Sequence, residues 1–131
     1  MKTIEICGKK YEIDCNALTY VKYRNMFNRG IFDDLKILQD FLVKYAYLTK
    51  KIKDENPDID DITIINSLST LMIDDMDLFA EAATRMAYIM IYTANKEIEE
   101  YENWLEKISS IKTNDEWIVE VTEFAVNCFC W

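Results

Sequence analysis

Apolar side chains recur every three to four residues along most of this chain, and the densest such pattern covers residues 76–95. Alanine, methionine and phenylalanine side chains line one face of the predicted helix, and isoleucine and tyrosine side chains fill much of the other face from Met86 onward. A helix that is apolar on nearly all of its faces must be buried, either in a protein core or in a membrane. The uncharged run from Met86 to Asn95 is about half as long as a bilayer crossing requires, so we expect a central core helix.

Alternating apolar and polar residues on both sides of Gly8 predict a β-hairpin over residues 3–14. A two-residue turn that begins at Gly8 places Ile6 opposite Tyr11, and we favour it because apolar pairs on a covered face outweigh one exposed pair of like charges. A turn that begins one residue earlier would instead place Glu5 opposite a lysine. Since a lone hairpin is marginal in water, its apolar face must lie on the helices.

The remaining pattern predicts a mostly α fold, with the N-terminal β-hairpin packed on a bundle of about five helices. We expect a single domain over residues 1–131, divided into the hairpin (1–15) and the helical bundle (16–131). Asn16 caps the first helix, whose expected apolar stripe includes Leu18 and Val21. The predicted helices run from 17 to 28, from 33 or 34 to 50, from 62 to 71, from 76 to 95 and from about 114 to 128.

The connections between these helices follow from charge and from breaker residues. Residues 50–61 hold the only proline and many charges, and we interpret them as an exposed connection. We expect Asp61 to cap a short helix that buries Ile62, Ile65, Leu68 and Leu71, and the next acidic pair, residues 74–75, to introduce the central helix. After residue 95 the helix either continues or restarts. Thr113 or Asn114 is expected to cap the last helix.

Charge and composition exclude several functions. Two glycines and one proline among 131 residues, half of them apolar, describe a helix-rich globular protein. A formal charge of −9 disfavours binding to nucleic acid or to anionic lipid. The chain has no histidine, which removes the commonest general base and any Ser-His or Cys-His nucleophile pair.

The four cysteines, Cys7, Cys15, Cys128 and Cys130, lie near the two ends of the chain and have no CxxC spacing. The N-terminus lacks the apolar segment of a signal peptide. We therefore expect free thiols in a reducing cytoplasm. A zinc site built from these cysteines would require the two ends to meet.

Pairs of carboxylates offer the one enzymatic alternative. Asp74 with Asp77, and Glu97 with Glu100, are three residues apart, a spacing that on a helix could hold Mg²⁺ as in all-α nucleotide pyrophosphatases. Magnesium enzymes that act on nucleotides usually add lysine or arginine near the metal to balance the triphosphate's charge, and the central stretch offers only Arg85 and Lys96. We therefore favour the simpler interpretation, in which these acids are helix-start charges and a solvated face, and we expect neither a bound metal nor a cofactor.

Aromatic residues are concentrated in the second half, and Tyr and Trp are enriched where proteins meet other proteins. Many of them will be core residues, and Trp131, at the chain end, is the best candidate for exposure. We expect contacts with a partner to be drawn from six residues: Tyr88, Ile91, Tyr92, Trp104, Trp117 and Phe129.

The order of these elements resembles the tail assembly chaperones of long-tailed bacteriophages, in particular those of phages and prophages of low-GC Gram-positive bacteria. The resemblance rests on the hairpin motif I-x-I-x-G-K-x-Y-x-I at residues 4–13, the capped helix at residues 16–27, the Leu and Phe stripe after it, the aromatic middle, and the closing segment NDEWIVEVTEFAVNCF at residues 114–129. It covers nearly the whole chain, through patterns and not through an invariant motif.

This resemblance implies a non-enzymatic protein of the bacterial cytoplasm that is absent from the mature virion. Such chaperones are thought to coat the tape-measure protein and to recruit tail-tube subunits, and many have a longer frameshifted form. The family supplies no catalytic residues. We also expect shallow binding surfaces and self-association, and a small phage adaptor or regulatory protein remains an alternative.

Overall fold

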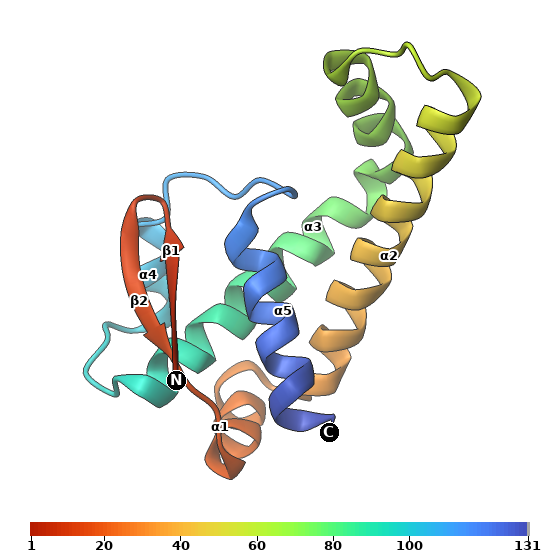
Figure 1. Ribbon diagram of the computed structural model, residues 1–131. Helices are drawn as coiled ribbons and strands as arrows, with labels where there is room; N and C mark the ends of the chain where they lie inside the picture. Colours follow the sequence, from red (N-terminus) through yellow and green to blue (C-terminus); the bar gives the residue numbers. More distant parts are fainter. Residues whose placement is uncertain (131) are drawn as a thin grey trace.

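A computed structural model describes residues 1–130, which form a two-stranded antiparallel sheet and five helices (Figure 1). This confirms the expected mostly α fold with an N-terminal hairpin. Among the described residues, no helix is both long and apolar enough to cross a membrane. The prediction for Trp131 lies outside these residues. In chain order the elements are β1 (Lys2–Ile6), β2 (Lys9–Ile13), α1 (Ala17–Phe27), α2 (Ile31–Glu55), α3 (Asp61–Ala94), α4 (Tyr101–Glu106) and α5 (Glu116–Phe129).

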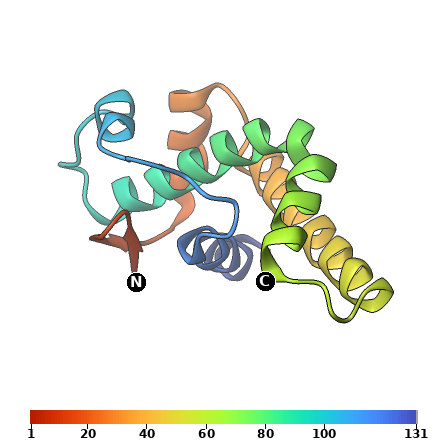
Figure 2. The same cartoon turned by 90° about the horizontal axis from the view of Figure 1, so that it is seen from above.

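The C-terminal half of α3 is the centre of the core, as its all-round apolar pattern predicts. The six successive residues from Met86 to Ile91 are all buried. Helix α3 packs against α1, α2, α5 and β2, and Figure 2 shows α1 on one side of it with α5 and the hairpin on the other. The amide of Asp14 also donates to the carbonyl of Met90 at 3.1 Å, which ties the end of the hairpin to this helix.

Helix α3 is much longer than predicted, because the expected short helix and the central helix form one continuous helix of 34 residues. Its N-cap is Asp60, not Asp61, and the Asp60 carboxylate accepts a hydrogen bond from the Thr63 amide at 2.8 Å. No glycine or proline interrupts residues 61–94. The acidic pair at 74–75 therefore lies inside the helix, where aspartate costs only a fraction of a kcal/mol.

Helix α2 also runs further than predicted, from Ile31 to Glu55, so the exposed connection shrinks to residues 56–60. The Asp33 carboxylate accepts a hydrogen bond from the Gly30 amide just before the helix. The end of α2 and the start of α3 project together from the rest of the molecule (Figure 1). We call this projection, residues 43–71, the arm.

The hairpin turn differs from the one we favoured: Glu5 lies opposite Lys10, so the turn residues are Cys7 and Gly8. Both turn residues have positive φ, of 50° and 82°, as a type I′ turn requires. The two registers differ by two residues and therefore expose the same faces of the strands. Ile4, Ile6 and Ile13 are buried in the observed register and would face the same way in the other. Charge pairing and turn geometry therefore decide between the two registers.

The smaller helices correct two further expectations and decide one that the sequence left open. Asn16 caps α1 as predicted, but Leu18 and Val21 are exposed, and the buried positions are Thr19 and Tyr23. After residue 95 the helix stops and restarts as the short α4. The N-cap of α5 is Asp115, one or two residues later than expected.

The two ends of the described chain are covalently joined by a disulfide between Cys15 and Cys128. The expectation of four free thiols is therefore wrong, and only Cys7 and Cys130 are free, both exposed. Spacing along the sequence did not reveal this pair because it lies 113 residues apart and only the fold brings it together.

Candidate partner-binding site

Four of the six residues expected to contact a partner are core residues. Tyr88, Ile91, Trp104 and Trp117 are all at least 96% buried. The rings of Tyr88 and Trp104 pack with their centroids 5.5 Å apart, in an aromatic cluster that also includes Tyr101. These four side chains cannot form a free surface in the folded chain.

The other two expected residues are half-buried. Tyr92 lies at the edge of the core. Phe129 packs edge-on against Tyr20 at 4.6 Å and lies near Phe32, which is 48% exposed. The aromatic character of the second half thus comes mostly from core packing.

The paired carboxylates are not arranged as a metal site. Asp74 and Asp77 are exposed on α3. Glu97 and Glu100 lie in the connection between α3 and α4 and not on one helical face. Within residues 1–130, no group of three or more Asp, Glu, Cys or His side chains is placed to hold a metal ion.

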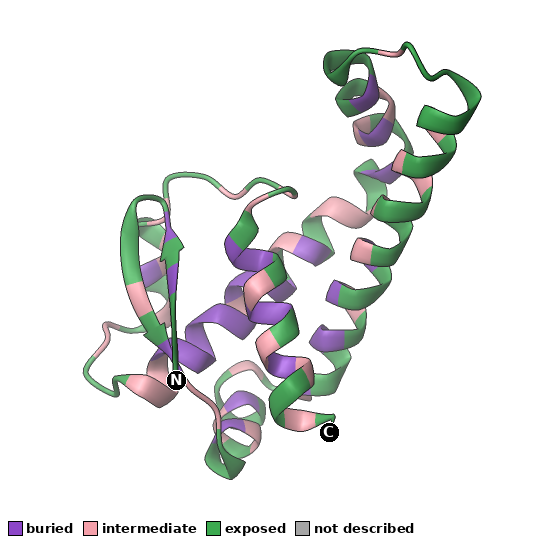
Figure 3. Ribbon diagram, viewed as in Figure 1, coloured by how far each residue is buried: buried purple, intermediate pink, exposed green. Residues whose placement is uncertain are grey.

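Large apolar side chains are instead exposed along the N-terminal half of α3. Of the predicted stripe at 62, 65, 68 and 71 only Leu68 is buried, and the helix buries Ile64 and Met72 in place of the other three. The arm is only a pair of helices, so α2 covers a narrow strip of α3 and leaves its other faces to solvent (Figure 3). The side chains left exposed are Ile62, Ile65, Leu71 and Ile73, which are 72%, 55%, 54% and 61% exposed.

A groove of about 410 Å³ lies where the arm meets the rest of the molecule. This volume is within the range in which proteins commonly hold ligands. Three buried residues, Phe41, Leu68 and Met72, contribute to its lining, and Ile65 contributes an exposed side chain. The other lining residues are Tyr45, Ser69 and Met76 from the two helices and Ile111, Lys112, Thr113 and Asn114 from the segment before α5.

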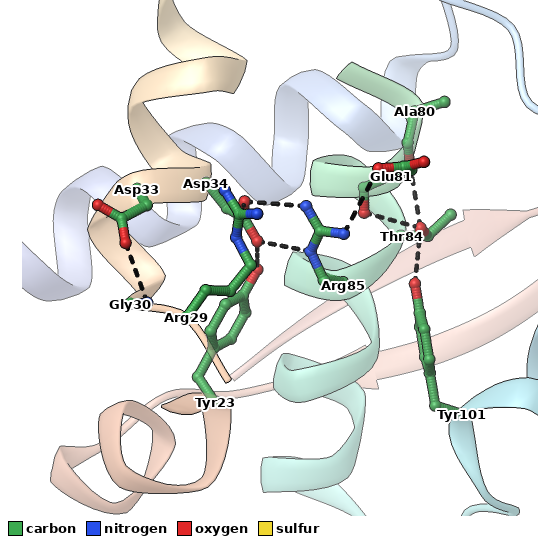
Figure 4. Close-up of polar contacts among 10 residues, drawn as sticks. All are labelled: Tyr23, Arg29, Gly30, Asp33, Asp34, Ala80, Glu81, Thr84, Arg85 and Tyr101. Carbon is green, nitrogen blue, oxygen red and sulfur yellow. Dashed lines mark hydrogen bonds and ion pairs between the residues drawn. The ribbon is translucent and has the colours of Figure 1, made fainter. Parts of the chain in front are cut away.

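A buried polar cluster joins the start of α2 to α1 and to the C-terminal half of α3 (Figure 4). Asp34 of α2 is fully buried, and Arg85 of α3 binds it with two hydrogen bonds, from Nε to Oδ2 at 2.7 Å and from Nη2 to Oδ1 at 3.0 Å. The Nε of Arg29 lies 2.8 Å from Oδ1. The hydroxyl of Tyr23 in α1 donates to Oδ2. One carboxylate thus joins α1, α2 and α3.

The protonation states in this cluster follow from burial and from the Asp34 charge. Burial, together with the hydrogen bond to Asp34, raises the pKa of the Tyr23 hydroxyl well above its usual value. Burial alone would lower the pKa of Arg85, but its hydrogen bonds and ion pair with Asp34 raise it overall. Tyr23 therefore remains a neutral donor and Arg85 a cation. The cluster therefore holds α1, α2 and α3 together through one charged carboxylate.

Sequence reasoning missed the groove, although one signal was present. Phe41 and Tyr45 lie on the apolar stripe of α2, Phe41 buried and Tyr45 half-buried, but nothing in the sequence marked them as partly open to a groove. The signal was the excess of apolar residues over 61–73, on more faces than one partner helix can cover.

Comparison with protein-family models, with curated protein sequences and with solved structures finds no match for this chain. The groove, the exposed apolar side chains and the distribution of charge are the features of this protein that bear on its function.

Proposed function

We propose that this protein is a non-enzymatic phage tail assembly chaperone, which binds helical segments of the tape-measure protein and recruits tail-tube subunits. The observation that supports this proposal is the apolar groove beside the exposed isoleucines of the arm. An amphipathic helix bound in an apolar groove is a recurrent mode of recognition between proteins. A tape-measure protein, long and helical, offers many such segments.

The character of the groove suits a chaperone that must later release its client. Met72 and Met76 contribute flexible, polarisable side chains, which adapt to clients of different sequence. Modest contacts in each subunit can be multiplied by many copies bound along one long client. The growing tail tube could then displace the copies one at a time.

Net charge and location fit the same role. A charge of −9 would keep loaded complexes dispersed by mutual repulsion. Assembly of a tail takes place in the host cytoplasm, which is the location we propose. The Cys15–Cys128 disulfide is the observation that weighs against it, because cytoplasmic thiols are normally kept reduced.

The test is co-expression with the very long helical protein that the proposal expects to be encoded nearby. Ile65→Glu places a charge on the groove and should reduce the soluble fraction of that client several-fold. Leu71→Glu is the matched control, because Leu71 lies on the same helix with nearly equal exposure, 54% against 55%, and does not line the groove.

Two results would count against this proposal. One is a client that remains equally soluble with and without the chain. The other is an equal loss of solubility in both variants, which would place binding outside the groove. Binding of a different phage protein instead would indicate the adaptor alternative. Trp104→Glu is a control for unfolding, because this residue is fully buried.

A further inference from the structure

Charge is distributed very unevenly between the two parts of the chain that meet at the groove. Residues 1–60 contain ten acidic and eleven basic residues, whereas residues 61–131 contain fourteen acidic and only four basic residues. Residues 61–131 therefore carry a net charge of −10 and residues 1–60 a net charge of +1, so the net negative charge of the protein belongs to its second half.

Two helices next to the groove, α3 and α5, are poor in cations, whereas α2, which contributes Phe41 and Tyr45 to the lining, carries five lysines and five acidic residues. Helix α3 carries five acidic residues and a single basic one, Arg85, which is bound to Asp34. Helix α5, which begins just beyond the groove, carries three acidic residues and no basic one. Lys112 is the only basic residue in the groove lining.

A second hollow, of about 290 Å³, is lined in part by the segment before α5 and shares Lys112 with the groove. Four carboxylates contribute to it, from Glu5, Asp115, Glu116 and Glu120. Lys2 reaches Glu120 at 3.4 Å, whereas Glu116 forms no ion pair with any residue in the part of the chain described. The apolar groove thus continues into an acidic surface.

We propose that the groove binds an amphipathic helix whose apolar face is bordered by lysine or arginine. The inference rests on the proposed function in that it concerns the same groove, and it adds the chemistry of the client. Apolar side chains of the client would occupy the groove, and its cations would lie against the carboxylates of the adjacent hollow. A second copy of this acidic chain, or an acidic peptide, would meet like charge there.

The probes are three synthetic helices of about 18 residues, roughly five turns, with identical apolar faces. Their flanking positions carry lysine, glutamine or glutamate, and affinity is measured by fluorescence anisotropy with the intact chain. The lysine helix should bind about tenfold more tightly than the glutamate helix at low salt. Raising the salt from roughly 50 mM to roughly 500 mM should remove most of the difference, because solvent-exposed charges are screened.

Two pairs of variants separate the contribution of the apolar groove to binding from that of the adjacent carboxylates. Ile65→Gln should weaken binding of all three helices, whereas Leu71→Gln should weaken none. Glu116→Gln should lower the preference for lysine about threefold, a size expected for one exposed pair. Glu123→Gln is its control, because Glu123 is exposed two turns further along α5 and lines neither hollow.

Equal affinity of the lysine and glutamate helices at low salt would overturn the inference, and so would equal effects of the two glutamate variants. If no helix binds while the chain still solubilises the tape-measure protein, the inference fails and the proposed function stands. If the lysine helix binds in the groove while the tape-measure protein stays insoluble, the inference stands and the proposed function fails.

Discussion

Asp34 shows at the scale of one residue how a buried charge can be tolerated. Its side chain has no exposed surface, and its oxygens are surrounded by two guanidinium groups and one phenol. Such a carboxylate stabilises a fold only while its partners remain, because each partner would otherwise be left with an unpaired polar group.

Asp34→Asn should lower the free energy of unfolding by about 3 kcal/mol, because it leaves Arg29 without a counter-charge and Arg85 with only the exposed carboxylate of Glu81, 3.8 Å away. Urea denaturation followed by circular dichroism measures the change. Asp40→Asn is the control, since Asp40 is exposed on the same helix, and it should change stability by less than about 0.5 kcal/mol. Equal losses in the two variants would mean that the cluster contributes nothing specific.

Single residues also show where periodicity alone fails. Leu18 and Val21 fit an apolar stripe on α1, yet the helix turns Thr19 and Tyr23 inward. The reason is polar pairing: the Thr19 hydroxyl bonds that of Thr93 at 3.0 Å, and the Tyr23 hydroxyl bonds Asp34. A hydropathy pattern carries no information about partners on distant helices.

At the scale of elements, the arm differs from the rest of α2 and α3. Phe41 is the last fully buried residue of α2, and α3 has its first at Ile64. Between these positions the two helices have mainly each other as partners. Stability within one helix is uneven where few buried contacts support its backbone hydrogen bonds.

Native-state hydrogen exchange should therefore show two levels of protection along α3. Amides of residues 62–70 should exchange through local opening of the arm, well before those of residues 86–91. Binding of a client helix should slow the exchange of residues 62–70 and leave that of residues 86–91 unchanged. Uniform protection along the 34 residues would contradict this view of the arm.

The whole molecule is closed by contacts between its two ends. Helix α5 packs against β1, α2 and α3, and the Cys15–Cys128 bond joins the segment after the hairpin to the end of this helix. A cross-link over 113 residues removes much of the conformational freedom of the unfolded chain.

Replacing Cys15 and Cys128 together by serine should lower the free energy of unfolding by about 3 kcal/mol. Urea denaturation without reductant measures this loss. Replacing Cys7 and Cys130, both exposed and free, should have little effect. Thiol titration of the folded wild type should count two reactive cysteines, and a count of four would show that the bond is not formed.

The sequence by itself determined the hairpin, the helical class and the all-round burial of the second half of α3, because these depend on periodicity, capping and composition within short stretches. Only the tertiary structure decided the length of α3, the hairpin register, the Asp34 cluster, the disulfide and the groove. Each of these depends on which distant segment lies opposite a residue. Burial of Tyr88 and exposure of Ile65 on the same helix follow from one cause: α3 is enclosed at its C-terminal end and has a single partner helix at its N-terminal end.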